Sequence, residues 1–286
     1  MSTEQKKLLN SCPVCNATNF TTSDICTVDG PLLLCEKCGQ LISQCTEDRY
    51  HITMQQFDKE RVTLPFGASI KRAFRLHSKR LDLARKYCNN RPAQSIRLLD
   101  VGCSSGAFLL NAKMLGFNAE GVEPAKKAVD TAKSFNLNVH HGYLESINFA
   151  DNTFDLITLF EVIEHLNDPN QLLKECHRIL KPDGIMMIGT ANTDSWTVRF
   201  MKQEWEYFNM DQHGGHISFF NSHSIRKIAN LSKFNVECIK TRCVKFYDKT
   251  NKNKILSTVT KIFAELLNIP SQIFGVGHDM IAVLRK

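Results

Sequence analysis

The central part of the chain alternates between short apolar runs and amphipathic stretches, a pattern that predicts strands and helices in succession. The most informative stretch begins with an apolar run at Ile96 that ends in Asp100. The chain then turns through Gly102, Ser104 and Gly106 and resumes with apolar residues at helical spacing. A strand, a tight turn and a helix in this order place the turn outside the carboxyl end of the strand. A doubly wound sheet binds its ligands there, and the free N–H groups of the helix point to the same place.

Similar patterns predict the rest of an α/β fold with a doubly wound sheet. Further strands are expected at residues 118–122, 138–141, 154–160, 185–189, 236–247 and 280–284. Besides the helix after the turn, helices are expected at residues 69–88, 125–135, 168–180, 222–231 and 255–268. The run at 154–160 is almost continuously apolar, as expected for a central parallel strand covered on both faces. The sequence Pro182-Asp-Gly184 is expected to end the preceding helix before the next strand begins.

Three kinds of ligand are compatible with the turn. A dinucleotide site would have glycine in place of Ser104, where the backbone approaches the pyrophosphate. The sequence Gly102-Cys-Ser104-Ser-Gly106 also spells the nucleophile elbow of a serine hydrolase. Asp100 favours a third class, because a carboxylate at the strand end repels a pyrophosphate and attracts a sulfonium or ammonium cation.

The acidic residue at the end of the second strand narrows this choice. Glu123 lies about twenty residues beyond the turn, where a carboxylate binds the two hydroxyls of a ribose. A hydrolase elbow normally follows several strands of its sheet, but residues 50–93 are charged and helical in pattern. A nucleoside with a positive charge is therefore favoured, and a serine hydrolase that uses Ser104 stays open as an alternative.

Several segments between residues 96 and 192 resemble those of one enzyme family. The matching segments are Asp100-Val-Gly-Cys-Ser-Ser-Gly106, Gly121-Val-Glu-Pro124, His141-Gly-Tyr-Leu-Glu145, Phe154-Asp-Leu-Ile-Thr-Leu-Phe-Glu-Val-Ile-Glu-His-Leu166 and Arg178-Ile-Leu-Lys-Pro-Asp-Gly184. They resemble the class I S-adenosylmethionine (SAM)-dependent methyltransferases, in the branch similar to the ubiquinone-biosynthesis O-methyltransferases and to sugar- and antibiotic-pathway enzymes. The chain departs from the family in one place, since Ser104 replaces the middle glycine of the turn.

The resemblance implies a seven-stranded Rossmann-like methyltransferase sheet with SAM as its cofactor. In this family the final strand, here 280–284, inserts antiparallel between the strand at 185–189 and the one that precedes the final strand. The resemblance also implies that a residue after the strand at 138–141 contacts the adenine ring and that the end of the strand at 154–160 faces both cofactor and acceptor. The candidate cofactor-binding residues are Asp100, Gly102, Ser104, Gly106, Glu123, Leu144, Phe160 and Glu161.

Recognition of the methyl acceptor is expected in an insertion at about 196–221, which is rich in aromatic residues and contains paired glycines. Trp205, Tyr207 and Asp211 are the candidate substrate-binding residues. A loop with this composition could close over a small acceptor and exclude water.

Methyl transfer to an oxygen requires a base, and an imidazole has a suitable pKa. His216 is the first candidate because it matches the histidine that precedes a Phe-Ser or Phe-Asn signature in similar enzymes, and His213 and His165 follow. These histidines could instead be structural. A metal site formed by Asp211, His213 and His216 is a further alternative.

The first 48 residues contain two Cys-x-x-Cys pairs, Cys12 with Cys15 and Cys35 with Cys38. Four thiolates close a tetrahedral site, so the pattern predicts a structural zinc ribbon. Two redox-active disulfides are the alternative. The ribbon from 11 to 45 has three acidic residues and one lysine, a formal charge of −2, which argues against nucleic-acid binding. It is expected to dock on its own catalytic domain or to shape a substrate entrance.

Positive charge concentrates in the segment at 49–95, interpreted as a basic helical linker or cap. Ten Lys and Arg residues lie between 59 and 91. They could form a solvated helix face or dock on a membrane surface. Alternatively, Lys71, Arg72, Arg75 and Arg80 could attract a phosphate-bearing acceptor. The amphipathic helix at 255–268 is expected to pack in the core, with membrane docking or dimerisation as alternatives.

These observations predict a zinc ribbon at 1–48 followed by a methyltransferase domain at 96–286 that acts on a small, phosphorylated or sugar-like acceptor. The chain of 286 residues has no apolar run of membrane-spanning length and no signal-peptide pattern at its start, so a cytoplasmic location is expected. The alternatives are an RNA methyltransferase, favoured by the net charge of +7, the serine hydrolase, and a binding protein that has lost catalysis.

Overall fold

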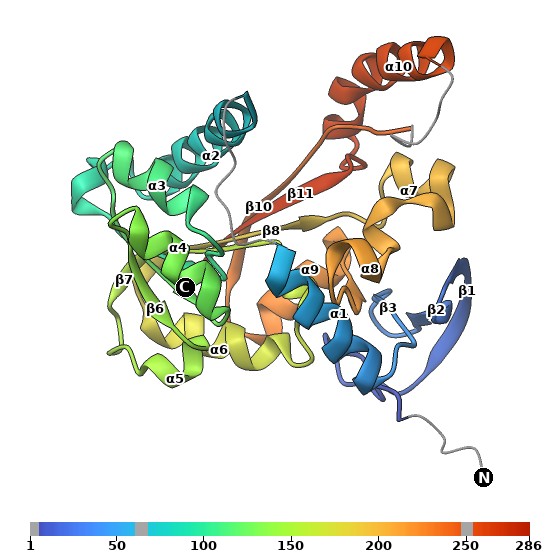
Figure 1. Cartoon of the computed structure of the whole chain (residues 1–286), viewed down its shortest axis with the longest axis horizontal. Helices are drawn as coiled ribbons and strands as arrows, with labels where there is room; N and C mark the ends of the chain where they lie inside the picture. Colours follow the sequence, from blue (N-terminus) through green and yellow to red (C-terminus); the bar gives the residue numbers. More distant parts are fainter. Residues whose placement is uncertain (1–5, 61–67, 247–253) are drawn as a thin grey trace.

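The computed structural model describes residues 6–60, 68–246 and 254–286 of the chain. Its largest element is a seven-stranded sheet with the order β10-β11-β8-β7-β4-β5-β6 (Figure 1). In chain order these strands are β4 (Arg97–Val101), β5 (Asn118–Glu123), β6 (Asn138–His141), β7 (Phe154–Phe160), β8 (Leu180–Ala191), β10 (Asn235–Arg242) and β11 (Asp279–Arg285). Strands β4 to β8 are parallel. This arrangement confirms the predicted α/β fold class.

The last strand has the predicted antiparallel position. β11 pairs antiparallel with β8 on one side, where Asp279 faces Ala191, and antiparallel with β10 on the other, where Asp279 faces Arg242. The start of β11 and the end of β10 therefore lie at the edge of the sheet where the parallel strands end. This carboxyl edge also carries the turn after β4.

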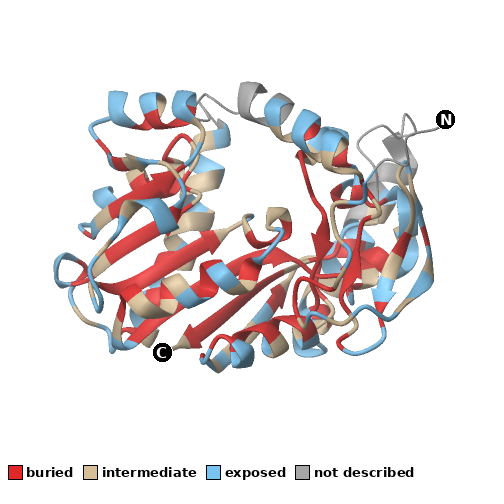
Figure 2. Ribbon diagram, turned by 90° about the horizontal axis from the view of Figure 1, so that it is seen from below, coloured by how far each residue is buried: buried red, intermediate tan, exposed pale blue. Residues whose placement is uncertain are grey.

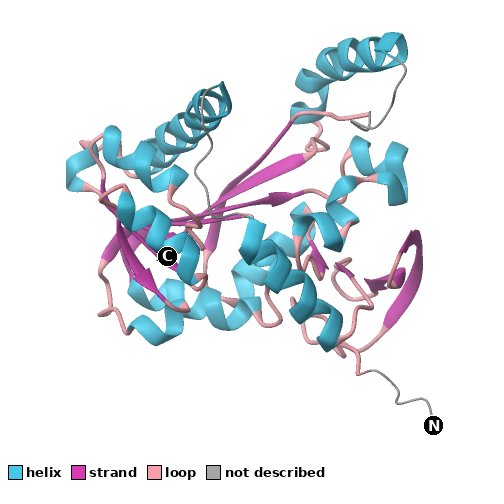
Figure 3. Cartoon of the chain, in the orientation of Figure 1, coloured by secondary structure: helices cyan, strands magenta, loops and turns pink. Residues whose placement is uncertain are grey.

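Helices cover both faces of the sheet (Figures 2 and 3). One face packs against α2 (Ala68–Tyr87), α3 (Ala107–Met114) and α4 (Lys126–Ser134), and the other against α5 (Leu144–Ile147), α6 (Pro169–Ile179) and α9 (Ser222–Leu231). Alternate residues of a strand point to opposite faces. Leu98 accordingly packs on the α3 side and Leu99 on the α6 side. The two apolar layers make each central strand inaccessible to water.

A second, four-stranded sheet lies beside the first and has the order β1-β2-β3-β9. Its strands are β1 (Phe20–Thr27), β2 (Gly30–Cys35), β3 (Leu41–Ile42) and β9 (Ser218–Phe219). β9 belongs to the insertion, and its Phe219 pairs antiparallel with Leu41 of the ribbon. The ribbon and the insertion therefore share one sheet, although they are separated by more than 170 residues.

The remaining elements connect these layers. They are α1 (Glu47–Glu60), η1 (Ala93–Ser95), η2 (Ile163–His165), α7 (Trp196–Met201), η3 (Lys202–Glu204), η4 (Glu206–Phe208), α8 (Met210–His213) and α10 (Lys254–Ile273). Two ion pairs tie the insertion to the ribbon side: Lys202 binds Asp24 at 2.7 Å, and Arg49, at the start of α1, binds Asp211 at 3.0 Å. Within the described residues, no helix has the length and apolar character that crossing a bilayer requires.

Among the predictions that differ from the structure are two boundaries and one packing arrangement. The segment Pro182 to Gly184 does not separate helix from strand, because α6 ends at Ile179 and β8 begins at Leu180. β10 ends at Arg242 rather than at residue 247, which lies outside the described residues. The predicted core packing of the helix at 255–268 is only partly right, since most of the large apolar side chains described on α10 are exposed. Residues 1–5 of the predicted ribbon and 61–67 of the predicted cap lie outside the described residues.

Candidate functional site

The turn after β4 adopts left-handed backbone conformations at three of its residues. The φ angles are 72° at Gly102, 48° at Ser104 and 86° at Gly106. A Cβ on Gly106 would lie 2.4 Å from Cδ1 of Leu137, and one on Gly102 would lie 2.5 Å from Cγ2 of Val162. Glycine is therefore required at both ends of the turn by backbone conformation and by space. α3 begins directly after Gly106, so its first N–H groups open at this edge.

The end of β5 contacts this turn through a carboxylate. Oε2 of Glu123 accepts a hydrogen bond from the backbone N–H of Ser104 at 2.8 Å, and Oε1 accepts one from the N–H of Ala125 at 2.9 Å. The Glu123 side chain is buried. These two bonds fix the carboxylate beside the turn.

Asp100 lies one strand away and is also buried. Its Oδ1 accepts a hydrogen bond from Oγ1 of Thr158 on the neighbouring β7 at 2.6 Å. Burial raises the pKa of Asp100 to about 7, and the Thr158 hydroxyl and the Arg80 guanidinium partly oppose this rise. A carboxylate that is costly to ionise in the free chain is stabilised when a cation binds beside it.

Arg80, from α2, lies above the end of β7. Its guanidinium carbon is 4.2 Å from the ring centroid of Phe160, which makes a cation–π contact. The next residue, Glu161, has a φ of 58° and is accessible to solvent. Desolvation by the surrounding protein atoms, followed by the nearby Asp279 carboxylate, nevertheless raises the pKa of Glu161. The Arg80 guanidinium opposes this rise. Burial lowers the pKa of Arg80, and the adjacent Arg242 lowers it further. Two cations, Arg80 and Arg242, therefore meet two acids, Glu161 and Asp279, at this edge.

Leu144 opens α5 directly after β6 and is buried in the apolar layer that includes Val122. All eight predicted cofactor residues therefore lie at or next to the ends of β4, β5, β6 and β7. Their predicted individual roles remain predictions.

Comparison with known proteins identifies the family. A family model described as a methyltransferase domain matches residues 70–239, more than half of the chain. The chain belongs to this methyltransferase domain family. A ubiquinone biosynthesis O-methyltransferase from Maricaulis maris is 31% identical over 124 residues, which cover 40% of this chain and 49% of that protein. The chain thus spans about half the length of the curated relatives it matches.

Solved structures of SAM-dependent methyltransferases share the fold. One from Archaeoglobus fulgidus matches with a TM-score of 0.51 and 18% identity over 73% of this chain and 94% of that one. One from Thermotoga maritima has a TM-score of 0.51 and 19% identity over 82% and 99% of the two chains. The predicted family and fold are confirmed, and of the three ligands considered for the turn, this methyltransferase domain fits the sulfonium nucleoside SAM.

The methyltransferase domain also carries a buried polar cluster next to the end of β7. Glu164 accepts hydrogen bonds from the Tyr207 hydroxyl and, at 3.2 Å, from the Thr190 hydroxyl. Nε2 of His216 lies 4.0 Å from Glu164, and the rings of His216 and His165 are 4.7 Å apart between centroids. Burial, followed by the neighbouring carboxylate of Glu161, raises the pKa of Glu164 well above its usual value.

The structure groups possible metal ligands differently from the sequence prediction. Among the described residues, Glu164, His165 and His216 bring their ligand atoms within 4.8 Å of one another. Asp211 is not part of that group, because its exposed carboxylate binds Arg49. The alternative set with Asp211 therefore does not assemble, whereas His213 still stacks on His216 with ring centroids 5.3 Å apart.

The aromatic residues predicted to bind the acceptor are buried. Trp205 is almost inaccessible, and its Nε1 donates to Nδ1 of His278 at 3.2 Å. Tyr207 stacks on Trp205, and both pack in the cluster that contains Phe219. In this conformation both side chains form part of the apolar core of the insertion.

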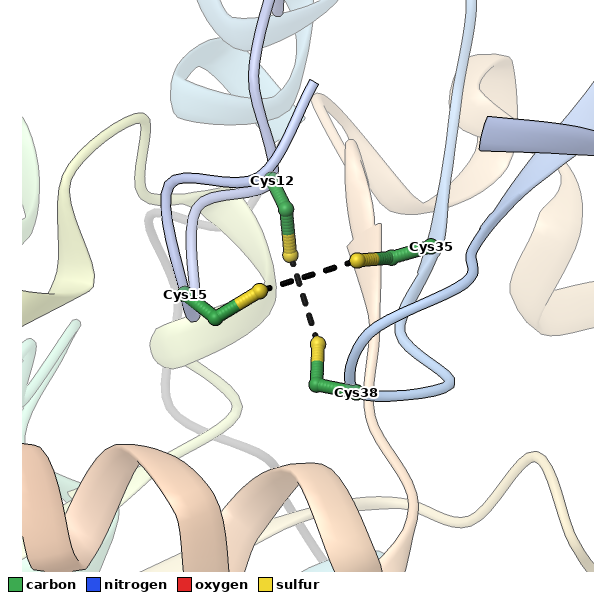
Figure 4. Close-up of side chains that lie close together, drawn as sticks. All are labelled: Cys12, Cys15, Cys35 and Cys38. Carbon is green, nitrogen blue, oxygen red and sulfur yellow. Dashed lines mark hydrogen bonds between the residues drawn. The ribbon is translucent and has the colours of Figure 1, made fainter. Parts of the chain in front are cut away.

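The four ribbon cysteines converge as predicted (Figure 4). Sγ of Cys12 lies 3.5 Å from Sγ of Cys38, and Sγ of Cys15 lies 3.6 Å from Sγ of Cys35. Zinc–sulfur bonds of about 2.3 Å would place tetrahedral sulfurs about 3.8 Å apart. The donor set therefore fits a zinc ion. The four thiols come from two turns of the ribbon and leave no position open, as in a structural site.

Two parts of the site escaped the sequence analysis. Thr158 is the one hydroxyl residue in the otherwise apolar middle of β7, and that exception could have signalled a buried hydrogen-bond partner. Arg242 and Asp279 pair at 3.0 Å where β10 ends and β11 begins, and no local motif marks them.

Proposed function

We propose that the chain transfers the methyl group of SAM to a small-molecule acceptor, phosphorylated or sugar-like, at the carboxyl edge of the sheet. The observation that carries this proposal is the pair of buried carboxylates, Asp100 and Glu123, at the ends of adjacent strands around one tight turn. Two acids in this arrangement repel a pyrophosphate and favour a nucleoside with a positive charge. The names of the curated relatives support oxygen as the atom methylated.

The residues around the turn would bind the cofactor. Glu123, held by the N–H groups of Ser104 and Ala125, would accept the ribose hydroxyls. Asp100 would bind the ammonium group of the methionine part, and Leu144 would contact the adenine. SAM supplies a methyl group on a positively charged sulfur. An acceptor nucleophile can attack the methyl carbon in line, and the sulfur leaves as a neutral thioether. The chain contributes mainly alignment of the acceptor with that methyl group.

The buried cluster after β7 would manage the acceptor proton. His216 is held by the backbone carbonyl of Tyr207, 2.9 Å from its Nδ1, so its Nε2 points towards Glu164. Burial raises the pKa of Glu164, but a proton on His216 would favour the ionised form of Glu164, so each charged form would stabilise the other once the base accepts a proton. His165 and His213 pack against His216 and would hold its ring in place.

An anionic group on the acceptor would be recognised by Arg80 and Arg242. The Nε atoms of both side chains are buried, and neither has a hydrogen-bond partner among the described residues. Arg80 lies near Glu161 at the end of β7, and Arg242 pairs with Asp279 at 3.0 Å. A phosphate or carboxylate that binds between two guanidinium groups would satisfy these donors.

Calorimetry on the full chain tests the choice of cofactor. We expect SAM and its demethylated product to bind at one site per chain, and NAD to show no binding at the same concentrations. The Ser104→Ala variant should keep this affinity, because its contribution is a backbone N–H. Binding of NAD in place of SAM, or covalent labelling of Ser104 by an activated phosphonate, would contradict the proposal.

A further inference from the structure

Helix α10 packs on the sheet through its small and polar residues. Ala264 and Ser271 are buried, and the Ser271 carbonyl accepts a hydrogen bond from the Thr241 hydroxyl of β10 at 3.2 Å. The Asn268 side chain accepts the backbone N–H of Val244 at 2.9 Å. These three residues follow a helical spacing of three and four, so they lie on one face.

The opposite face of α10 carries large apolar side chains that are exposed to solvent. Leu266 is 71% exposed, Ile269 70% and Ile273 74%. At 100° per residue, their positions centre about half a turn away from those of Ala264 and Ser271. The other members of this exposed face are Val259, Ile262 and Phe263. The usual amphipathic arrangement, in which the apolar stripe faces the core, is reversed on this helix.

The apolar surface continues from α10 onto α7. The ring of Phe263 lies 6.0 Å from that of Phe246, which in turn lies 4.9 Å from that of Phe200 on α7. Phe200 and Phe274, just beyond the end of α10, are both largely exposed. We call this set on α10, its end and α7 the apolar ridge. Its extent exceeds the scattered single apolar residues that are normal on a protein surface.

The apolar ridge lies at the carboxyl edge of the sheet. α10 connects the end of β10 to the start of β11, and both of these ends are at that edge. α2 begins at the same edge, because its last residue, Tyr87, lies at the opposite one, where its carbonyl accepts from Arg285 at the end of β11. In Figure 1, α2 and α10 both extend beyond the body of the molecule at the same side of the view.

The first half of α2 supplies exposed positive charge at this edge. Helix α2 contains seven Lys and Arg residues and one acid, Asp82. Six of its cations are exposed: Lys71, Arg72, Arg75 and Lys79 lie nearer the carboxyl edge, and Arg85 and Lys86 lie in the last turn. Arg199 on α7 and Lys245 after β10, which are also exposed, add positive charge next to the apolar ridge.

We propose that the apolar ridge and the cations of α2 dock the chain on an anionic phospholipid surface. A helix that exposes an apolar face beside Lys and Arg residues binds in the plane of the membrane interface, with its apolar side chains among the acyl chains. Cations nearby are attracted to anionic headgroups. A second copy of the chain is a poorer fit, since a two-fold contact through α10 would place basic surfaces together with few acids to pair with them.

This orientation has a consequence for the site. The carboxyl edge, which carries Asp100, Glu123 and Phe160, would face the bilayer. An acceptor that resides at the membrane interface could then reach the site without passing through water.

Vesicle flotation with the full, metal-loaded chain tests the docking. We expect the chain to float with vesicles that contain phosphatidylglycerol and phosphatidylcholine, and its partition to fall as salt rises. The double variant Leu266→Glu with Ile269→Glu should reduce the partition at least tenfold, while circular dichroism and SAM affinity stay unchanged. The matched control is Met114→Glu, because Met114 is also exposed but lies at the end of α3, away from the carboxyl edge. The control should float like the unmodified chain.

Three results would overturn the proposal. The first is equal partition of the double variant and the unmodified chain, and the second is equal binding to pure phosphatidylcholine vesicles. The third is a dimer in sedimentation velocity that the double variant dissociates, without vesicle binding, because it would assign the apolar ridge to a second copy of the chain. SAM binding is measured separately, so each of these results leaves the proposed function standing.

Discussion

The carboxylate of Glu123, at the end of β5, accepts the backbone N–H of Ser104 in the turn after β4, with an Oε2···N distance of 2.8 Å. The bond joins the ends of two adjacent strands, so the acid and the turn form one rigid unit. We expect Glu123→Gln to weaken SAM binding on the order of a hundredfold, because the charged acceptor of the ribose hydroxyls is lost.

Calorimetry measures this change, and Glu120→Gln is the control. Glu120 is on the same strand and equally buried, but its carboxylate binds Arg97 and His140 instead. Equal affinities of the two variants for SAM would remove Glu123 from the proposed role.

The buried Asp100 should make the stability of the free chain depend on pH. Its pKa is about 7 in the folded chain, against a usual 3.8, so the folded state retains the proton and loses stability as pH rises from about 4 to about 7. The Asp100→Asn variant lacks this loss. Without ligand, it should be more stable than the unmodified chain at pH 8, by up to about 4 kcal/mol. The difference should vanish near pH 4.

Thermal unfolding at the two pH values measures the effect, and titration of other groups affects both proteins alike. The same variant should bind SAM poorly, since it lacks the charge that attracts the ammonium group. A variant that is equally stabilised at pH 4 and pH 8 would show that the side chain's shape, rather than its ionisation, determines the difference.

The turn should be sensitive to a single added methyl group. Gly106→Ala places a Cβ 2.4 Å from Leu137 and adds the cost of a positive φ, so we expect a loss of roughly 3 kcal/mol or more in the free energy of unfolding. Gly116→Ala is the matched control. Its φ of 87° is nearly the same, but the nearest atom to its Cβ would be 4.0 Å away.

We expect the control to lose only about 1 kcal/mol. Denaturant unfolding of both variants measures the two values. If they are equal, backbone conformation alone, and not the close contact with Leu137, sets the requirement for glycine.

The four ribbon thiols should bind one metal ion that stabilises the ribbon. We expect elemental analysis to find one zinc per chain and Cys38→Ser to lose it, with a fall in melting temperature of at least about 5 °C. The control Cys26→Ser changes an exposed cysteine outside the cluster and should keep both metal and stability. A metal-free chain in which thiol titration reveals two disulfides would instead support the redox alternative.

Sequence patterns could predict those elements whose periodicity is local. β6, β7 and α9 have the predicted bounds, and the apolar run of β7 and the Asn221 cap of α9 explain two of the three. β9 could not be predicted, since Ser218 and Phe219 are too few to form a pattern and are a strand only because Leu41 and Ile42 pair with them.

The positions of Asp100 and Glu123 at the carboxyl edge were predictable, because each ends a strand within a short motif. It was not predictable where chemistry depends on packing. An aromatic residue such as Trp205 looks the same in a sequence whether it contacts an acceptor or fills the core, and its burial and its bond to His278 are visible only in the structure. The partners of Glu164 are likewise distant in sequence, since Thr190 and Tyr207 lie 26 and 43 residues away.

The pairing of Leu41 with Phe219 means that neither the ribbon nor the insertion has a complete sheet of its own. Expression of the first fifty residues alone would leave β3 with an open edge, and deletion of those residues would leave β9 without any strand to bind. His216 lies two residues before β9, so a metal ion at the cysteines would fix the position of a histidine that is far away in the chain. Removal of the metal should therefore displace β9 and His216 before it affects the large sheet.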